Sequence, residues 1–176
     1  MADKTQNPMR EIRIEKVTLN IGAGKDQNKL SKGIKLLTSL TNKQPIKTKT
    51  SKRIPGWGLR PGLPIGCKVT VRNEDAQILL KRLLTAVDLL LKESQFDENG
   101  NISFGVKECI DIPELKYDPE IGIMGLQVCI TLERRGFRVK KRRTRPGVLR
   151  QNHKISKLNS IEYMKSQFQV KLPEDE

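Results

Sequence analysis

The sequence predicts an α+β domain: a largely antiparallel sheet with helices on one face, a long basic loop and a basic C-terminal arm. Alternating or β-rich runs indicate strands over residues 12–21, 46–50, 67–72, 102–112 and 125–134. Apolar residues three and four apart indicate only two long helices, over residues 27–42 and from residue 73 to about residue 90. Because two long helices serve about five strands, we expect the helices to share one face of the sheet.

The length and the composition bound the architecture. The chain has 176 residues, of which 36% are apolar, so it can close one modest core, and we predict a single domain over residues 1–176. No run approaches the ~20 apolar residues that cross a bilayer. The first ten residues are charged where a signal peptide would be apolar, so we expect a soluble, intracellular protein.

Several elements carry local signals at their ends. Asn73 followed by Glu74 and Asp75 predicts an N-cap and an acidic first turn for the second long helix. The run DENGN at residues 97–101 predicts a turn. A short helix over about residues 156–168 closes the chain, capped by Ser156 or Asn159. Its spacing predicts four buried side chains: Leu158, Ile161, Met164 and Phe168.

Positive charge is concentrated in two segments. The chain holds 34 Lys and Arg against 20 Asp and Glu, a net charge of +14. Eight cations lie in residues 43–72 and eleven in residues 134–157, and neither segment contains an acid. The other 122 residues carry 15 cations and 20 acids, an ordinary balance. Because like charges in a block repel one another unless a counter-charge arrives, the two segments favour a nucleic-acid partner over a merely solvated surface.

The first segment, the basic loop (residues 43–72), mixes cations with amides, glycines and one aromatic residue. Four prolines and four glycines over residues 44–66 predict a long irregular loop held away from the core. Cations neutralise phosphate, glycines let the backbone approach, and a planar Trp57 can stack on an unpaired base. The glycines on either side of Trp57 favour exposure over a place in the core. The candidate rRNA contacts in this segment are Gln44, Lys47, Lys49, Trp57, Arg60, Lys68 and Arg72.

The second segment, the basic arm (residues 134–157), is too charged and too interrupted by Pro146 and Gly147 to fold alone. We therefore predict an extended arm or loop. His153, the only histidine, has no partners for catalysis or metal binding there, so it is expected to be a polar loop residue or an RNA contact. The candidate RNA contacts of the arm are Arg138, Lys140, Lys141, Arg142, Arg143 and Arg145.

No motif supports catalysis or a cofactor. In NIGAGK at residues 20–25, Leu19 and Asp26 stand where a Walker A loop needs Gly and Ser or Thr, so the glycines indicate a tight strand-to-helix turn. Three widely spaced cysteines without a CxxC pair predict reduced, buried thiols and no metal site. Residues 97–120 hold seven acids against two lysines, which leaves open a solvated face or a docking surface for a basic protein.

Two other classes of protein are weighed against an RNA-binding protein. An RNA-modifying or RNA-cleaving enzyme needs a nucleophile beside a base, or a metal cluster, and the sequence offers neither. A peripheral membrane-binding protein needs an amphipathic helix with a basic face, whereas the arm has Pro146 and Gly147. We therefore predict a non-enzymatic RNA-binding protein without a membrane partner.

Long ordered blocks of the sequence resemble one family. The blocks are NPMRE at 7–11, KVTLNIGAG at 16–24, NKQPIKTKTSKRIPGWGLRPGLPIGCKVTVR at 42–72, FDENGNISFGVKECIDIP at 96–113, KYDPEIGIMGLQVCITLERRGFRV at 116–139 and KKRR at 140–143. They are similar to blocks of the large-subunit ribosomal protein five family in its archaeal and eukaryotic form, whose eukaryotic member is numbered eleven. The resemblance implies a cytoplasmic ribosomal protein that binds 5S rRNA and attaches it to the central protuberance. Its implied partners are large-subunit rRNA, P-site tRNA and neighbouring ribosomal proteins, including a small-subunit head protein across an intersubunit bridge.

The resemblance also assigns individual residues. The 5S-contacting amides of the family match Asn20 and Gln44, and its aromatic residue and arginine match Trp57 and Arg60. The loop that reaches P-site tRNA matches residues 49–62, and the bridge surface would lie on the side that carries the strand-rich second half. The implied tRNA contacts are Lys52, Arg53, Ile54, Pro55 and Gly56.

Overall fold

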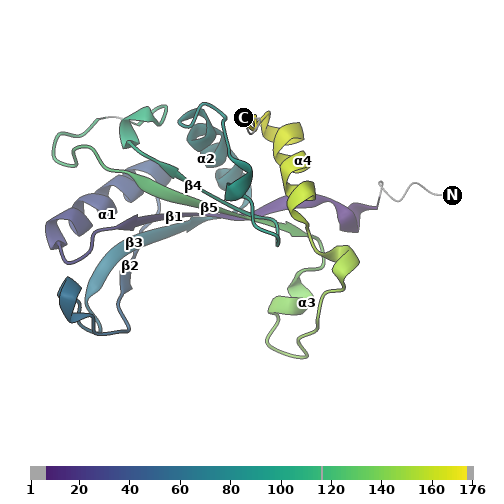
Figure 1. Ribbon diagram of the computed structural model, residues 1–176, viewed down its shortest axis with the longest axis horizontal. Coiled ribbons are helices and arrows are strands. Elements are labelled where there is room, and N and C mark those ends of the chain that lie inside the picture. The colour runs from purple at the N-terminus through teal and green to yellow at the C-terminus, as the bar shows by residue number, and fades with distance from the viewer. Residues whose placement is uncertain (1–6, 116, 174–176) are drawn as a thin grey trace.

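The computed structural model describes residues 7–115 and 117–173, so both ends of the predicted domain lie outside the described residues. One antiparallel sheet has the order β2-β3-β1-β5-β4, with β1 (Ile12–Gly22), β2 (Ile46–Lys49), β3 (Pro64–Val71), β4 (Asn101–Val106) and β5 (Leu126–Arg134). Three helices, α1 (Gln27–Thr41), α2 (Asn73–Thr85) and α4 (Lys157–Phe168), lie on one side of it (Figure 1). The segment between β2 and β3 and the short helix α3 (Arg138–Lys141) extend on the other side. The predicted α+β fold is confirmed.

The core lies between these helices and the inner face of the sheet. Alternate residues of β1, including Val17, Leu19 and Ile21, are at most 3% exposed. Helix α2 places Leu80 and Leu83 against this face with no exposed area. Full burial of such a side chain stabilises the fold by about 1.5–3 kcal/mol. The two-residue period of the strands and the 3.6-residue period of the helices therefore meet in one apolar interface.

A tight turn joins β1 to α1, as the glycines of NIGAGK predict. Gly24 has a φ of 63°, in the left-handed region that glycine adopts without strain. Asp26 caps the helix, because its carboxylate accepts hydrogen bonds from the backbone amides of Asn28 (2.9 Å) and Lys29 (3.3 Å). The carboxylate at this position would repel a phosphate, so the turn is a structural feature rather than an anion-binding loop.

The second long helix is shorter than the sequence predicts. Helix α2 ends at Thr85 rather than near residue 90, because Asp88 and Leu89 adopt left-handed conformations with φ of 55° and 59°. The Leu89 amide donates to the Leu84 carbonyl (3.0 Å), which satisfies one of the last carbonyls of the helix. At the other end the acidic first turn is present, but Asn73 is the first helical residue rather than the N-cap.

Two strand boundaries also differ from the predicted ones. β4 ends at Val106, and a 3-10 turn over Cys109–Asp111 follows where the sequence predicts a strand up to residue 112. β3 begins at Pro64, three residues before the predicted start. Cys109 is buried and Ile110 is exposed, so a single-turn element here reproduces the two-residue alternation that a strand would show.

The C-terminal helix α4 is present, but one of its predicted core residues is exposed. The Ser156 hydroxyl accepts from the backbone amide of Asn159 (3.4 Å), so Ser156 is the cap. Ile161 and Met164 are buried as predicted, whereas Leu158 is 70% exposed. The buried stripe runs through residues 160, 161 and 164, and Leu158 lies about 110° around the helix from its centre at 100° per residue.

The cysteine prediction is wrong at one position. All three thiols are free, and Cys67 and Cys109 are buried, but Cys129 is exposed. Cys129 occupies an outward position of β5, opposite Thr18 of β1, on the face of the sheet that the helices leave uncovered. Burial raises the pKa of Cys67, so that thiol stays protonated at neutral pH.

Candidate nucleic-acid interface

The side of the sheet opposite the helices carries polar side chains in register. Asn20 of β1 lies opposite Lys68 of β3 on one side and opposite Gln127 of β5 on the other. The Asn20 side-chain amide donates to Oε1 of Gln127 at 3.1 Å, which fixes the orientation of Asn20. We name this surface the open face and define it by Thr18, Asn20, Lys68, Thr70, Gln127 and Cys129.

The basic loop is more regular than predicted, because residues 50–63 form a hairpin beyond the ends of β2 and β3. The Thr50 amide donates to the Leu63 carbonyl at 2.9 Å, and Ile54 and Leu59 exchange two backbone hydrogen bonds of 3.1 Å. A 3-10 turn over Pro55–Trp57 closes the tip. The prediction of an irregular loop is therefore wrong, since the prolines and glycines that interrupt regular structure also build tight turns.

The hairpin tip collects the residues to which the sequence assigns tRNA contact. Trp57 is 70% exposed, which confirms the prediction that it lies outside the core. Arg60 is exposed on the returning side of the hairpin. The other exposed residues of the tip are Lys52, Arg53, Ile54, Pro55 and Gly56.

The remaining loop candidates lie at the edge of the sheet rather than on the open face. Lys47 of edge strand β2 is in register with buried Cys67, so it faces the helix side of the sheet. Gln44 is exposed and precedes β2, and Lys49 lies at an irregularity in the β2–β3 register. The structure thus brings Asn20 and Lys68 together and leaves these three residues along the β2 edge.

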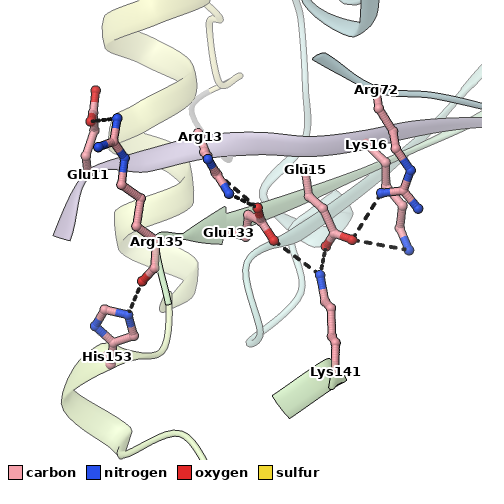
Figure 2. A network of polar contacts seen from close by, with 9 residues as sticks. All are labelled: Glu11, Arg13, Glu15, Lys16, Arg72, Glu133, Arg135, Lys141 and His153. Carbon is pink, nitrogen blue, oxygen red and sulfur yellow. Dashed lines mark hydrogen bonds and ion pairs between the residues drawn. The ribbon is translucent and has the colours of Figure 1, made fainter. Parts of the chain in front are cut away.

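Two carboxylates hold helix α3 against the open face near the end of β5 (Figure 2). Nζ of Lys141 lies 2.6 Å from Oε2 of Glu15 and 3.2 Å from Oε2 of Glu133. Arg13 reaches Glu133 at 2.6 Å, and Arg72 reaches Glu15 at 3.4 Å. The side chains of Glu15 and Glu133 are only 11% and 13% exposed. We name this group the carboxylate cluster; it comprises Arg13, Glu15, Lys16, Arg72, Glu133 and Lys141.

A β-bulge brings Glu15 into this cluster. The register between β1 and β5 shifts between Ile14 and Lys16, so Glu15 is an extra residue in its strand. Ile14 and Val17 both stay in the core while Glu15 turns toward the open face. The three-residue gap between Ile14 and Val17 is the signal for the bulge in the sequence. The charge pattern alone missed Glu15 and Glu133, because both lie outside the acid-free segments.

The end of the arm that returns toward α4 is also fixed. Nε2 of His153 hydrogen-bonds to the carbonyl of Arg135 at 2.8 Å (Figure 2). Nη1 of Arg134 donates to the carbonyls of Asn152 (3.5 Å) and Lys154 (3.4 Å). His153 is therefore a structural residue that closes the base of the arm.

The arm between these contacts is partly folded, whereas the sequence predicts an extended segment. Its first residues form α3, and the Gly147 amide donates to the Val139 carbonyl at 3.1 Å, so the chain doubles back. Like charges tolerate this conformation because the side chains point into solvent. Within the described residues, five of the candidate cations are exposed and form no ion pair: Arg138, Lys140, Arg142, Arg143 and Arg145.

Glu15 predicts a pH dependence of stability. Burial raises the pKa of Glu15, but Lys141, Lys16 and Arg72 together lower it more, so its net pKa lies below the usual 4.5. Such a carboxyl stabilises the fold above its unfolded-state pKa, and the contribution disappears as the pH falls through the folded-state pKa. In urea unfolding, Glu15→Gln should lower the free energy of unfolding equally at about pH 8 and pH 6, and the difference should shrink at acid pH. A difference that grows on acidification would contradict this assignment.

Over residues 7–115 and 117–173, no three His, Cys, Asp or Glu side chains gather as a metal site. In the same part of the chain, no helix is long and apolar enough to cross a membrane.

Comparison with known proteins identifies the family. Residues 64–163 match the C-terminus of the ribosomal protein L5 family, and residues 7–60 match Ribosomal protein L5. The chain belongs to the ribosomal protein L5 family. Three archaeal relatives are named large ribosomal subunit protein uL5. The relative from Nanoarchaeum equitans is 47% identical and aligns over 95% of this chain and 99% of its own length. Those from Sulfurisphaera tokodaii and Methanosphaera stadtmanae are 45% and 43% identical, over 97% and 93% of this chain and 97% and 98% of their own lengths.

Family membership confirms the resemblance found in the sequence. Ribosomal protein L5 is a structural, non-enzymatic family of the large ribosomal subunit, so the predictions of a ribosomal, cytoplasmic protein that is not an enzyme are confirmed as well.

Proposed function

We propose that this chain binds 5S rRNA and attaches it, together with large-subunit rRNA, to the central protuberance of the large ribosomal subunit. The observation that carries the proposal is the placement of the RNA-reactive side chains. The open face, the hairpin over residues 50–63 and the arm all lie on the side of the sheet that the helices leave uncovered (Figure 1). A surface that combines exposed cations, an oriented amide and an exposed aromatic ring suits folded RNA.

Each group of residues has a distinct proposed role. Lys68 and Arg60 would neutralise phosphates, as would the exposed arm cations, and these contacts position the RNA without reading its sequence. Asn20, held by Gln127, presents a preoriented amide to a base edge or a 2′-hydroxyl. Trp57 would stack on an unpaired base. At the edge of the sheet, Gln44, Lys47 and Lys49 would extend the contact along β2, with Arg72 at the end of β3.

The hairpin tip is the part of this surface that we propose reaches P-site tRNA. Lys52 and Arg53 are exposed beside Pro55 and Gly56, and the two backbone hydrogen bonds between Ile54 and Leu59 stiffen the tip. Residues 52–56 contain no aromatic ring, so this contact would be made to phosphates and sugars rather than by stacking. A stiff, cationic tip loses little entropy on binding.

A second surface favours a protein partner. A groove of about 610 Å³ runs between α1 and residues 109–122 and is lined largely by apolar side chains, among them Ile34, Leu115 and Ile121. Ile110 and Tyr117 are exposed at this site. Five acids lie in the same segment: Glu108, Asp111, Glu114, Asp118 and Glu120. An apolar groove with an acidic rim is complementary to a basic protein, so we propose this surface for the small-subunit head protein across the intersubunit bridge.

Chemical protection mapping of 5S rRNA with the purified protein tests the main proposal. We expect a compact protected region in the 5S transcript, and no such region in a control RNA of equal length. Substituting Asn20 by Ala should remove protection at particular nucleotides and leave the rest of the footprint, because an amide contacts one nucleotide. Equal, diffuse protection of both RNAs by a folded protein would overturn the proposal.

A further inference from the structure

The carboxylate cluster is unexpected on a surface proposed to bind RNA. Glu15 and Glu133 are two of the few acids on the uncovered side of the sheet, and both would repel phosphate. Their side chains are almost covered, at 11% and 13% exposed, so they are poorly placed to contact an RNA or a protein partner. Their neighbours within the described residues are cations of the chain itself, which indicates an internal role (Figure 2).

The electrostatics of the cluster explain what the two acids do. Three of its cations, Arg13, Lys16 and Arg72, belong to β1 or to the end of β3, and the fourth, Lys141, belongs to α3. Without the two carboxylates, the cations of the sheet would repel the ammonium group of α3. With the carboxylates, Lys141 bridges Glu15 and Glu133 at 2.6 Å and 3.2 Å. Charged pairs that are largely covered from solvent are screened less than exposed pairs.

The arm is therefore tied to the sheet at both of its ends. Lys141 fixes the end nearest α3, and the contacts of His153 and Arg134 fix the returning end. The residues between these two ties carry Arg142, Arg143 and Arg145. Fixing both ends of a cationic loop lowers the entropy that it loses when it binds a rigid polyanion.

We infer that Glu15 and Glu133 are positioning residues for RNA binding: through Lys141 they hold α3 on the sheet, so that the free cations of the arm meet the RNA at fixed places beside the open face. This inference rests on the proposed function. It also moves Lys141 from the candidate RNA contacts to the positioning residues, because its ammonium group already has two carboxylate partners.

The inference predicts an effect opposite to that of simple charge. Removing two acids from an RNA-binding protein raises its net charge by two and should strengthen RNA binding. If the acids position the arm, the double variant Glu15→Gln/Glu133→Gln should instead bind 5S rRNA about tenfold more weakly. Its affinity should also depend less steeply on salt, because fewer arm cations reach phosphates. A matched control, Glu98→Gln/Glu162→Gln, makes the same charge change at exposed acids far from the cluster and should bind as well as the wild type or better.

Hydrogen exchange on the free protein tests the position of the arm without RNA. We expect the amides of residues 138–147 to exchange faster in Glu15→Gln/Glu133→Gln than in the wild type or the control, while the core strands stay protected. Lys141→Gln leaves the carboxylates with their sheet partners, so it tests the arm even if the double variant is poorly folded. It should lose more of the salt slope than the ~0.7–0.9 expected for one phosphate contact. Lys141→Arg should keep both protection and affinity.

The outcomes separate the inference from the function on which it rests. If the wild type fails to bind 5S rRNA, the proposed function is wrong, and the exchange experiment still decides whether the cluster holds the arm. If the wild type binds and Glu15→Gln/Glu133→Gln binds as tightly as the control, the positioning role is wrong. Unchanged exchange of residues 138–147 in Lys141→Gln would overturn it as well.

Discussion

The affinity of this chain for 5S rRNA is expected to fall by about 10³-fold or more when monovalent salt rises from about 50 to 200 mM. Binding of each phosphate by a lysine or arginine releases condensed counterions, so the logarithm of affinity falls linearly with the logarithm of salt concentration. Five unpaired arm cations together with Lys49, Lys52, Arg53, Arg60 and Lys68 can supply about six to ten such contacts, which sets the expected slope. Filter binding or fluorescence anisotropy at fixed magnesium concentration measures it.

A variant with fewer arm cations provides the control for this slope. Arg138→Gln/Arg142→Gln/Arg143→Gln removes three exposed cations that form no ion pair within the described residues, so the fold should be unaffected. Each lost phosphate contact should reduce the slope by about 0.7–0.9, and the loss should be similar for 5S rRNA and for unrelated RNA. Affinity that does not change between 50 and 200 mM salt would show that phosphate contacts are not the basis of binding.

The periodic part of the chain was predictable because periodicity and burial have the same cause. The alternation from Ile12 to Ile21 and the three- and four-residue spacing over residues 27–42 both arise from one buried side, so β1 and α1 follow the predicted bounds closely. The end of α2 was not predictable in this way. Apolar residues continue to Leu91, and the left-handed conformations of Asp88 and Leu89 that stop the helix depend on tertiary contacts.

The candidate site was predictable from composition only in part. Acid-free segments and an aromatic residue between glycines identify exposed RNA-reactive groups, and Trp57 is indeed exposed. Composition cannot show that Lys141 is engaged by carboxylates that lie 126 and 8 residues before it in the chain, because that pairing needs the sheet to exist first. It also cannot show that the register turns Lys47 away from the open face. Such long-range pairings decide which cations are available to a ligand.

Trp57→Ala is expected to weaken binding to the cognate RNA by about 1–3 kcal/mol, or roughly 5- to 150-fold. The ring is 70% exposed at the tip of a hairpin that is closed by its own backbone hydrogen bonds, so its removal should leave the melting temperature unchanged. The loss should therefore come from stacking on an unpaired base rather than from unfolding. Trp57→Phe keeps a planar ring and should restore most of the affinity.

Lys52, five residues earlier in the same hairpin, is the matched comparison. Its ammonium group can contact phosphate but cannot stack, so Lys52→Gln should weaken 5S rRNA and random RNA alike and should reduce the salt slope by about one phosphate contact. Trp57→Ala should leave that slope unchanged and should affect the cognate RNA far more than random RNA. Equal losses of Trp57→Ala on both RNAs would remove Trp57 from recognition, because a stacking site that selects a particular unpaired base must distinguish RNAs that present one from RNAs that do not.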